Sequence, residues 1–312
     1  MGISFTFVSI LCYIGAAYDY NTVVGAVLIG GIIEGCLGLL AKYWTKIITP
    51  IVSASVVTAI GFSLLSVGAS SFGGGAGAAD FGSVKNWILG SITLLCCILF
   101  NLFAKSYWKQ LSVLFGLVVG YIVAIPMGMV DFSSVTGASL ISIPQPLHFG
   151  IKFEPSSCVA IGMLFAINAI QAIGDFSATT TGGMDRMPTD EELKGGIVAY
   201  GISNVVGAIF GGLPTATYSQ NVGIVASTKV VARKVFRIAA VILLVAGLVP
   251  VFSAVLTTIP YCVLGGATIS VFASITMTGI KLITTQPLDF RNTTIVGLAI
   301  ALGMGVTQAN AA

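Results

Sequence analysis

The sequence consists largely of apolar runs that each have about the length needed to cross a lipid bilayer, roughly 20 residues. Only 8% of its 312 residues are charged, whereas a soluble domain carries about 25%. The chain therefore has too few charges to cover a surface that faces water, and we predict an all-α polytopic membrane protein. The apolar runs cover residues 2–17, 22–41, 47–68, 87–104, 111–130, 155–178, 195–212, 235–257, 261–280 and 293–308.

One stretch between two of these runs is too polar for an ordinary span: GGLPTATYSQNVGIVASTK, residues 211–229. The positions of Lys and Arg indicate whether it crosses, because basic residues concentrate in cytoplasmic loops. If residues 214–228 cross, 12 of the 14 basic residues lie on one side, and all except Lys85 and Lys152 are cytoplasmic; otherwise the split is 6 to 8. Crossing is therefore favoured, with residue 1 on the cytoplasmic side.

Such a polar crossing segment cannot face lipid, because unpaired backbone groups are costly in hydrocarbon. Gly211, Gly212 and Pro214 disfavour a helix before Ser219, while the sequence NVGIVAST from Asn221 onward is suited to a new helix. We expect an extended segment followed by a half-helix, the kind of broken span that binds substrate in secondary transporters. A re-entrant or merely kinked helix without a ligand is the alternative.

Two acidic residues lie inside the predicted spans, Glu34 and Asp175. Asp175 follows Asn168 and Gln171 at a spacing that places all three on one helix face, which we expect to point into the bundle. This polar stripe either belongs to a binding site or joins helices by hydrogen bonds. For Glu34 a packing role and a functional role are equally compatible with the sequence.

Nothing else in the sequence indicates a chemical site. The six cysteines lack the paired spacing of a zinc site, and no nucleotide-binding or hydrolase motif is present. We expect no cofactor, no metal and no nucleic-acid partner, and we predict that the protein is not an enzyme. In the charged loop of residues 184–196, Thr189 is expected to cap the start of a helix.

Three segments carry a resemblance to a known family. QNVGIVASTK, residues 220–229, resembles the signature of the nucleobase-ascorbate transporters (nucleobase-cation symporter-2), a Q/E/P-N-x-G-x(4)-T-K/R/G pattern. QAIGDFSATT, residues 171–180, is similar to the E-x-x-G-D motif of the family's eighth helix, and MGISFTF at the start looks like its broken third helix. The resemblance continues to NTTIVGLAIALGMGVTQ and covers essentially the whole chain.

The resemblance implies an inverted seven-span repeat with core and gate domains and two broken spans. Aligned in this way, the chain looks like helices 3 to 13 of a 14-span fold, and we interpret it as a fragment of a longer protein. A core domain, residues 1–44 and 155–257, would carry substrate like an elevator against a gate domain, residues 45–154 and 258–312. The gate would supply a homodimer contact in the full-length protein.

The same resemblance assigns roles to individual residues. Gln220 falls on the substrate-contacting position of the signature, and Asn221 is its orienting neighbour. Phe5 matches the aromatic residue of the third helix, and Ser219 and Gly223 complete the expected substrate-binding set around the two broken spans.

The eighth-helix motif departs from the family at its first position. Relatives carry a Glu that binds substrate and couples transport to protons, whereas this chain has Gln171, which can hydrogen-bond a purine edge but cannot be protonated. Asp175 matches the Asp of the motif and is our candidate for coupling to H⁺, with Na⁺ as the alternative. Tyr200 also stands where relatives often carry a polar residue.

Together these features predict a secondary active symporter in the cell (inner) membrane that imports an oxidised purine, xanthine or uric acid. Uracil or another nucleobase is the alternative substrate, although Gln220 resembles the xanthine and urate branch. An anion transporter of the same fold is less favoured because of the Gln-Asn signature. A membrane-embedded enzyme is less favoured because no nucleophile–base or metal constellation is visible.

The charge distribution yields a direct test of topology. If residues 214–228 cross the membrane, Lys194 and Arg233 lie on the same, cytoplasmic side. Single cysteines at these two positions in a cysteine-free full-length protein should then both resist an impermeant thiol reagent added to intact cells. Labelling of one position but not the other would show that the stretch is not a span.

Overall fold

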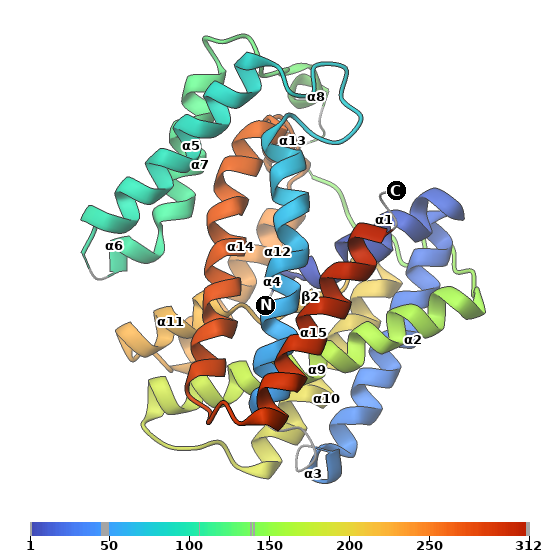
Figure 1. The fold of residues 1–312 in the computed structure, drawn as a ribbon. Coiled ribbons are helices and arrows are strands. Elements are labelled where there is room, and N and C mark those ends of the chain that lie inside the picture. Colours follow the sequence, from blue (N-terminus) through green and yellow to red (C-terminus); the bar gives the residue numbers. More distant parts are fainter. Residues whose placement is uncertain (1, 45–49, 106, 138, 140, 310–312) are drawn as a thin grey trace. The chain divides into compact units, whose positions relative to one another are not determined.

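The computed structural model describes residues 2–44, 50–105, 107–137, 139 and 141–309, and it is mostly helical (Figure 1). The chain forms two compact units, each assembled from segments that are distant in sequence. Unit 1 comprises residues 1–60, 144–229 and 279–305, and unit 2 comprises residues 61–143, 230–278 and 306–312. The helices α4 (Pro50–Phe72) and α14 (Tyr261–Thr284) each contribute to both units.

Unit 1 contains the polar stretch of residues 211–229 and the segment at the start of the chain that resembles a broken helix. Besides parts of α4 and α14, the elements of unit 1 are β1 (Gly2–Ile3), the 3-10 helix η1 (Phe5–Phe7), α1 (Val8–Ala17), α2 (Tyr20–Leu39), α3 (Ala41–Trp44), α9 (Pro155–Met184), α10 (Asp190–Ile209), β2 (Thr215–Ala216), α11 (Ser219–Thr228) and most of α15 (Phe290–Ala309). Unit 2 also contains α5 (Val84–Phe103), α6 (Tyr107–Gln110), α7 (Ser112–Ala124), α8 (Ser133–Thr136), α12 (Arg233–Gly247) and α13 (Pro250–Thr257).

Five helices in the described part of the chain are long and apolar enough to cross a membrane, and a sixth span results if α12 and α13 are counted as one. The five are Tyr20–Leu39, Ala54–Phe72, Val84–Phe103, Pro155–Met184 and Tyr261–Thr284. The helices α1 and α11 have 10 residues each, which corresponds to about 15 Å and half of the hydrocarbon thickness. Both therefore have the length of a half-helix.

The expected continuous span at residues 235–257 is wrong in one respect. The structure divides it into α12 and α13, which meet at an angle of 80°. Val249 adopts an extended conformation (φ −109°, ψ 93°), and Pro250 is the first residue of α13. A residue before proline is disfavoured in the helical region, and proline cannot continue the hydrogen-bond ladder of a preceding helix, so the chain turns at this point.

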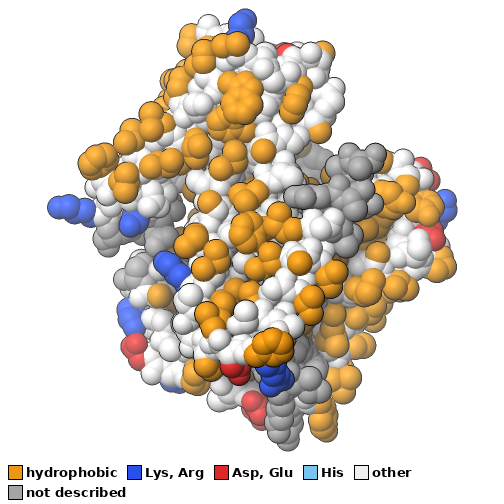
Figure 2. Space-filling view, viewed as in Figure 1, with side chains coloured by type: hydrophobic (Ala, Val, Ile, Leu, Met, Phe, Trp, Pro, Cys, Tyr) orange, Lys and Arg blue, Asp and Glu red, His pale blue; other side chains and the backbone are white. Residues whose placement is uncertain are grey.

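The exposed surface is rich in large apolar side chains. Figure 2 shows hydrophobic residues spread across the viewed face, with few charged groups among them. On α12, Ile238, Val241, Ile242, Leu243 and Leu244 are all more than 60% exposed. A water-soluble protein rarely exposes such contiguous apolar surface, so this surface is suited to contact with lipid acyl chains.

Within unit 1, α2 and α10 pack closely because glycines replace side chains at their contact. A Cβ atom on Gly201 of α10 would lie 2.4 Å from the backbone nitrogen of Gly35 and 2.6 Å from the carbonyl oxygen of Gly31, both on α2. On the neighbouring face of α2, a Cβ on Gly30 would overlap the ring of Phe165 from α9. Small residues of this kind allow membrane helices to approach closely.

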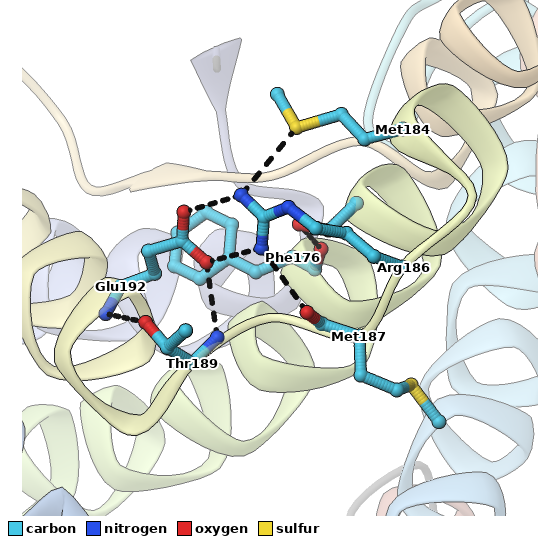
Figure 3. A network of polar contacts seen from close by, with 7 residues as sticks. Phe176, Met184, Arg186, Met187, Thr189 and Glu192 are labelled. Atoms are coloured by element: carbon cyan, nitrogen blue, oxygen red, sulfur yellow. Dashed lines mark hydrogen bonds and ion pairs between the residues drawn. The ribbon is translucent and has the colours of Figure 1, made fainter.

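The turn between α9 and α10 confirms the expected cap at Thr189. The Thr189 side chain accepts a hydrogen bond from the backbone of Glu192, and the Glu192 carboxylate accepts one from the backbone of Thr189, which together form a capping box. Figure 3 shows that Arg186 also binds Glu192 with both terminal nitrogens, at 2.7 and 2.8 Å. The Arg186 guanidinium and the Thr189 N–H hold the pKa of the Glu192 carboxyl well below its usual value, at about 2.

The glycine contact predicts different outcomes for two substitutions on the same helix. Gly201→Ala places a methyl group against backbone atoms that cannot move aside, and overpacking of this kind typically costs about 1–3 kcal/mol. Gly207→Ala is the matched control, because a Cβ at this position has no heavy atom within 4 Å. Thermal unfolding of the detergent-solubilised protein should show a lower Tm for Gly201→Ala only. Equal Tm values for the two variants would contradict this packing.

Candidate functional site

Two short strands join the start of the chain to the polar stretch of residues 211–229. Strands β1 and β2 pair antiparallel, with Gly2 opposite Ala216 and Ile3 opposite Thr215. The pairing is extended by a hydrogen bond from the Ser4 backbone N–H to the Pro214 carbonyl oxygen, at 2.8 Å. The two broken stretches therefore satisfy each other's backbone groups, as irregular chain in a membrane requires.

Each strand leads directly into a short helix. Strand β1 continues into η1 and α1, and β2 continues into α11 after Thr217 and Tyr218. The break before β2 follows from the sequence, since Gly211 has a positive φ of 75° and Pro214 lacks an N–H group. The Tyr218 hydroxyl donates a hydrogen bond of 2.6 Å to the Ile3 carbonyl oxygen and so fastens the start of α11 to β1.

The expected polar stripe on α9 faces the segment that contains β2. The Gln171 amide donates to the Thr217 carbonyl oxygen at 3.5 Å, and the Thr217 hydroxyl donates to Asp175 Oδ2 at 2.5 Å. Asn168 is 1% exposed and donates to the Thr215 carbonyl oxygen at 3.2 Å. All three residues of the stripe thus form hydrogen bonds with the segment between Thr215 and Thr217. The residue nearest the start of α9 binds Thr215, and the two later residues bind Thr217.

Glu34, whose role the sequence left open, belongs to the same cluster. Its side chain is fully buried, and its two carboxylate oxygens accept hydrogen bonds from the amides of Asn168 (3.1 Å) and Asn204 (2.9 Å). Asn204, on α10, in turn accepts from the Thr215 backbone N–H at 2.8 Å and from the Thr215 hydroxyl at 3.0 Å. Asn204 was not predicted from the sequence, although an Asn within the apolar run of α10 is itself a signal of a buried polar contact.

The Tyr200 hydroxyl lies in the same region of α10 and is also buried. It and Asn168 Oδ1 are the buried side-chain atoms of this cluster that have no hydrogen-bond partner among the described residues. The Tyr200 hydroxyl nevertheless lies close to Asn168 and to the backbone of Thr217, so it belongs to the same cluster.

The structure places the remaining candidate residues at the ends of the two broken stretches. Phe5 begins η1 and is half-buried, Asn221 is exposed in the first turn of α11, and Gly223 follows on the same helix. Ser219 and Gln220 are the first two residues of α11, but their side chains lie outside the described part of the structure. No group of three His, Cys, Asp or Glu side chains suited to a metal ion is found among the residues described.

Two broken spans, which pair through the short strands β1 and β2 and continue into half-helices, define a membrane transporter fold. In agreement with this, the transmembrane domain of a cyanobacterial bicarbonate transporter, BicA, is similar in structure with a TM-score of 0.68, over 97% of this chain and 80% of that one. The sequence identity is 20%, so this similarity concerns the fold alone.

Sequence comparison identifies the family. The sequence model of a protein family described as "Permease family" matches residues 1–312. The xanthine permeases XanQ and XanP of Escherichia coli are each 34% identical to this chain, over 98% of its length and 69% and 70% of theirs. The xanthine permease of Bacillus subtilis is 33% identical over 98% of this chain and 70% of its own length. The chain belongs to this permease family, the nucleobase-ascorbate transporters, and is a multi-pass membrane transporter rather than an enzyme.

Proposed function

We propose that the protein imports an oxidised purine, xanthine or uric acid, which binds where the two broken stretches of unit 1 meet. The observation that carries this proposal is the β1–β2 pair, because it brings the signature segment at the start of α11 next to the chain around Phe5. The family and the names of the relatives support a purine as the substrate. Uracil or another nucleobase is the second candidate substrate, and an anion transporter of the same fold is less favoured.

The residues around the strand pair have the chemistry that a purine requires. A carboxamide donates one hydrogen bond and accepts another, and this matches the alternating N–H and C=O groups of an oxidised purine. Gln220 and Asn221 supply such amides at the beginning of α11, where backbone N–H groups are also directed toward a ligand. Phe5, half-buried in η1, would stack on the purine plane.

Around this site, Gln171, Ser219 and Gly223 complete the proposed binding set. Gln171 already donates to the chain at Thr217, so its amide oxygen remains as an acceptor for the ligand. Gly223 lies one helical turn beyond Ser219 and presents no side chain on that face of α11.

We further propose that transport follows an elevator mechanism. Residues 1–44 and 155–257 would form the moving core, and residues 45–154 and 258–312 the gate through which the protein forms a homodimer. Residue 1 would lie on the cytoplasmic side of the inner (plasma) membrane, in accordance with the distribution of basic residues.

Gln220→Ala tests the binding site. A binding site that loses one hydrogen-bonding side chain leaves the ligand's groups unpaired, and we expect purine affinity to fall by roughly 10-fold or more. Equilibrium binding and uptake of labelled xanthine, urate, uracil and bicarbonate by the full-length protein provide the measurement. Gln145→Ala is the control, because Gln145 is exposed in the loop before α9.

Both variants should be expressed at the level of the unmodified protein. Unchanged purine affinity in Gln220→Ala would remove this residue from the site. Uptake of bicarbonate or uracil in preference to xanthine and urate by the unmodified protein would instead assign it to one of the competing substrate classes.

Asp175→Asn tests the coupling residue. Asp175 is 8% exposed and lies one helical turn beyond Gln171, which cannot bind a proton. We propose that the Asp175 carboxyl takes up the coupling proton on one side of the membrane and releases it on the other. The variant should lose accumulation driven by a pH gradient but retain purine binding and downhill exchange.

The matched control for this experiment is Asp190→Asn, which alters an exposed carboxyl in the first turn of α10. If Asp175→Asn still concentrates the purine when only a proton gradient is imposed, Asp175 does not couple transport to protons. The experiment is then repeated with a Na⁺ gradient, since a carboxylate that stays ionised is a ligand suited to that cation.

A further inference from the structure

Glu34 stands apart from every motif that the proposed function uses, yet it is one of the most deeply buried polar residues of unit 1. Its side chain is 0% exposed, and it lies in the last third of α2, five residues before Leu39. None of the ion pairs among the described residues includes it. A carboxyl group held in a membrane helix without a cation is costly, so its retention calls for a function.

We propose that Glu34 is the positioning residue of the substrate-binding strand: through Asn168 and Asn204 it sets the place of β2 at Thr215. This inference rests on the proposed function, because it takes β2 and the start of α11 to be part of the purine site.

The orientation of Asn204 follows from the strand. A backbone N–H group can only donate, so the Asn204 atom that lies 2.8 Å from the Thr215 nitrogen must be the amide oxygen. The same oxygen accepts from the Thr215 hydroxyl at 3.0 Å. The amide nitrogen of Asn204 therefore faces Glu34 Oε2, at 2.9 Å, and donates to it.

The orientation of Asn168 is determined in the same way. A carbonyl oxygen can only accept, so the Asn168 atom that lies 3.2 Å from the Thr215 carbonyl oxygen must be the amide nitrogen. The same nitrogen lies 3.1 Å from Glu34 Oε1 and donates to it. Both backbone groups of Thr215 are thus linked, through one Asn each, to a separate oxygen of Glu34.

A carboxyl side chain matches this arrangement better than an amide does, because each of its two oxygens lies opposite an Asn amide nitrogen. It has two acceptor oxygens, whereas an amide of the same shape would direct an N–H group against the N–H of one Asn. The carboxylate on α2 therefore joins α9, α10 and β2 at one residue of the strand. A displaced Thr215 would shift the start of α11, which follows three residues after β2, and small displacements of a binding group have large effects on transport or catalysis.

The arrangement predicts which double substitution restores the strand. Glu34→Gln introduces one N–H group that opposes an Asn amide, so it should raise KM for xanthine roughly 10-fold or more, with a smaller change in kcat. Adding Asn204→Asp moves the carboxylate to position 204. There it accepts from the new amide at position 34 and still accepts from Thr215, so KM should return to within about threefold of its original value.

The matched control moves the carboxylate to the other Asn. In the variant with Glu34→Gln and Asn168→Asp, the new amide at position 34 again finds an acceptor. The carboxylate at position 168, however, would oppose the Thr215 carbonyl oxygen, which only accepts. This pair should not restore KM. If neither or both of the double variants restore KM, Glu34 does not position the strand. The same conclusion follows if Glu34→Gln alone leaves KM unchanged.

A second measurement does not depend on the substrate. Ala216 is 3% exposed within β2, and Ala216→Cys in a cysteine-free protein should react slowly with N-ethylmaleimide. Glu34→Gln should accelerate this reaction at least several-fold, and only the exchange with Asn204→Asp should reverse the acceleration. If the unmodified protein transports no purine while the variants show this labelling pattern, the proposed function is overturned and the role of Glu34 stands.

The two double variants also test the proposal if Glu34→Gln alone does not fold. A folded and active protein carrying Glu34→Gln with Asn204→Asp, beside an inactive protein carrying Glu34→Gln with Asn168→Asp, would support the proposal. The reverse result would overturn it.

Discussion

The structure of unit 1 depends on the requirement that every backbone N–H and C=O group inside a membrane finds a partner within the protein. The chain is extended at two places, before η1 and before α11, and the backbone groups of these segments cannot form the hydrogen bonds of a helix. Two residues of strand on each side satisfy part of this requirement by pairing with one another. The side chains of α9 and α10 satisfy further groups at Thr215 and Thr217.

The same requirement explains why polar side chains concentrate where the chain is irregular. Asn168, Gln171 and Asn204 all bind backbone atoms of the segment around β2, while Asp175 binds the Thr217 hydroxyl. A ligand that enters such a region meets groups already held in place, which lowers the ordering cost of binding. The close approach of α2 to α10 at Gly201 and Gly35 contributes to this arrangement, because it brings the helices that carry Glu34 and Asn204 together.

Much of this site could be predicted from local sequence. Gly211 and Pro214 indicate a break in any helical context, and the polar stripe of α9 follows from helical periodicity. The bend at Val249 was missed because the apolar character of residues 235–257 is continuous, and hydropathy does not register the restriction that Pro250 places on its predecessor. The role of Glu34 could not be predicted, since its partners lie 134 and 170 residues away in the sequence.

The sequence by itself determined that the chain is a polytopic membrane protein with a broken, polar crossing segment, because apolar length, charge placement and helix-breaking residues act locally. Only the tertiary structure decided which groups complete the broken segment. The pairing of β1 with β2 joins residues 2 and 3 to residues 215 and 216, and the two amides between Glu34 and Thr215 acquire their orientation from a backbone that is distant in sequence. These hydrogen bonds require donor and acceptor to lie close together in space, and the packing of the helices and the pairing of the two strands bring them together.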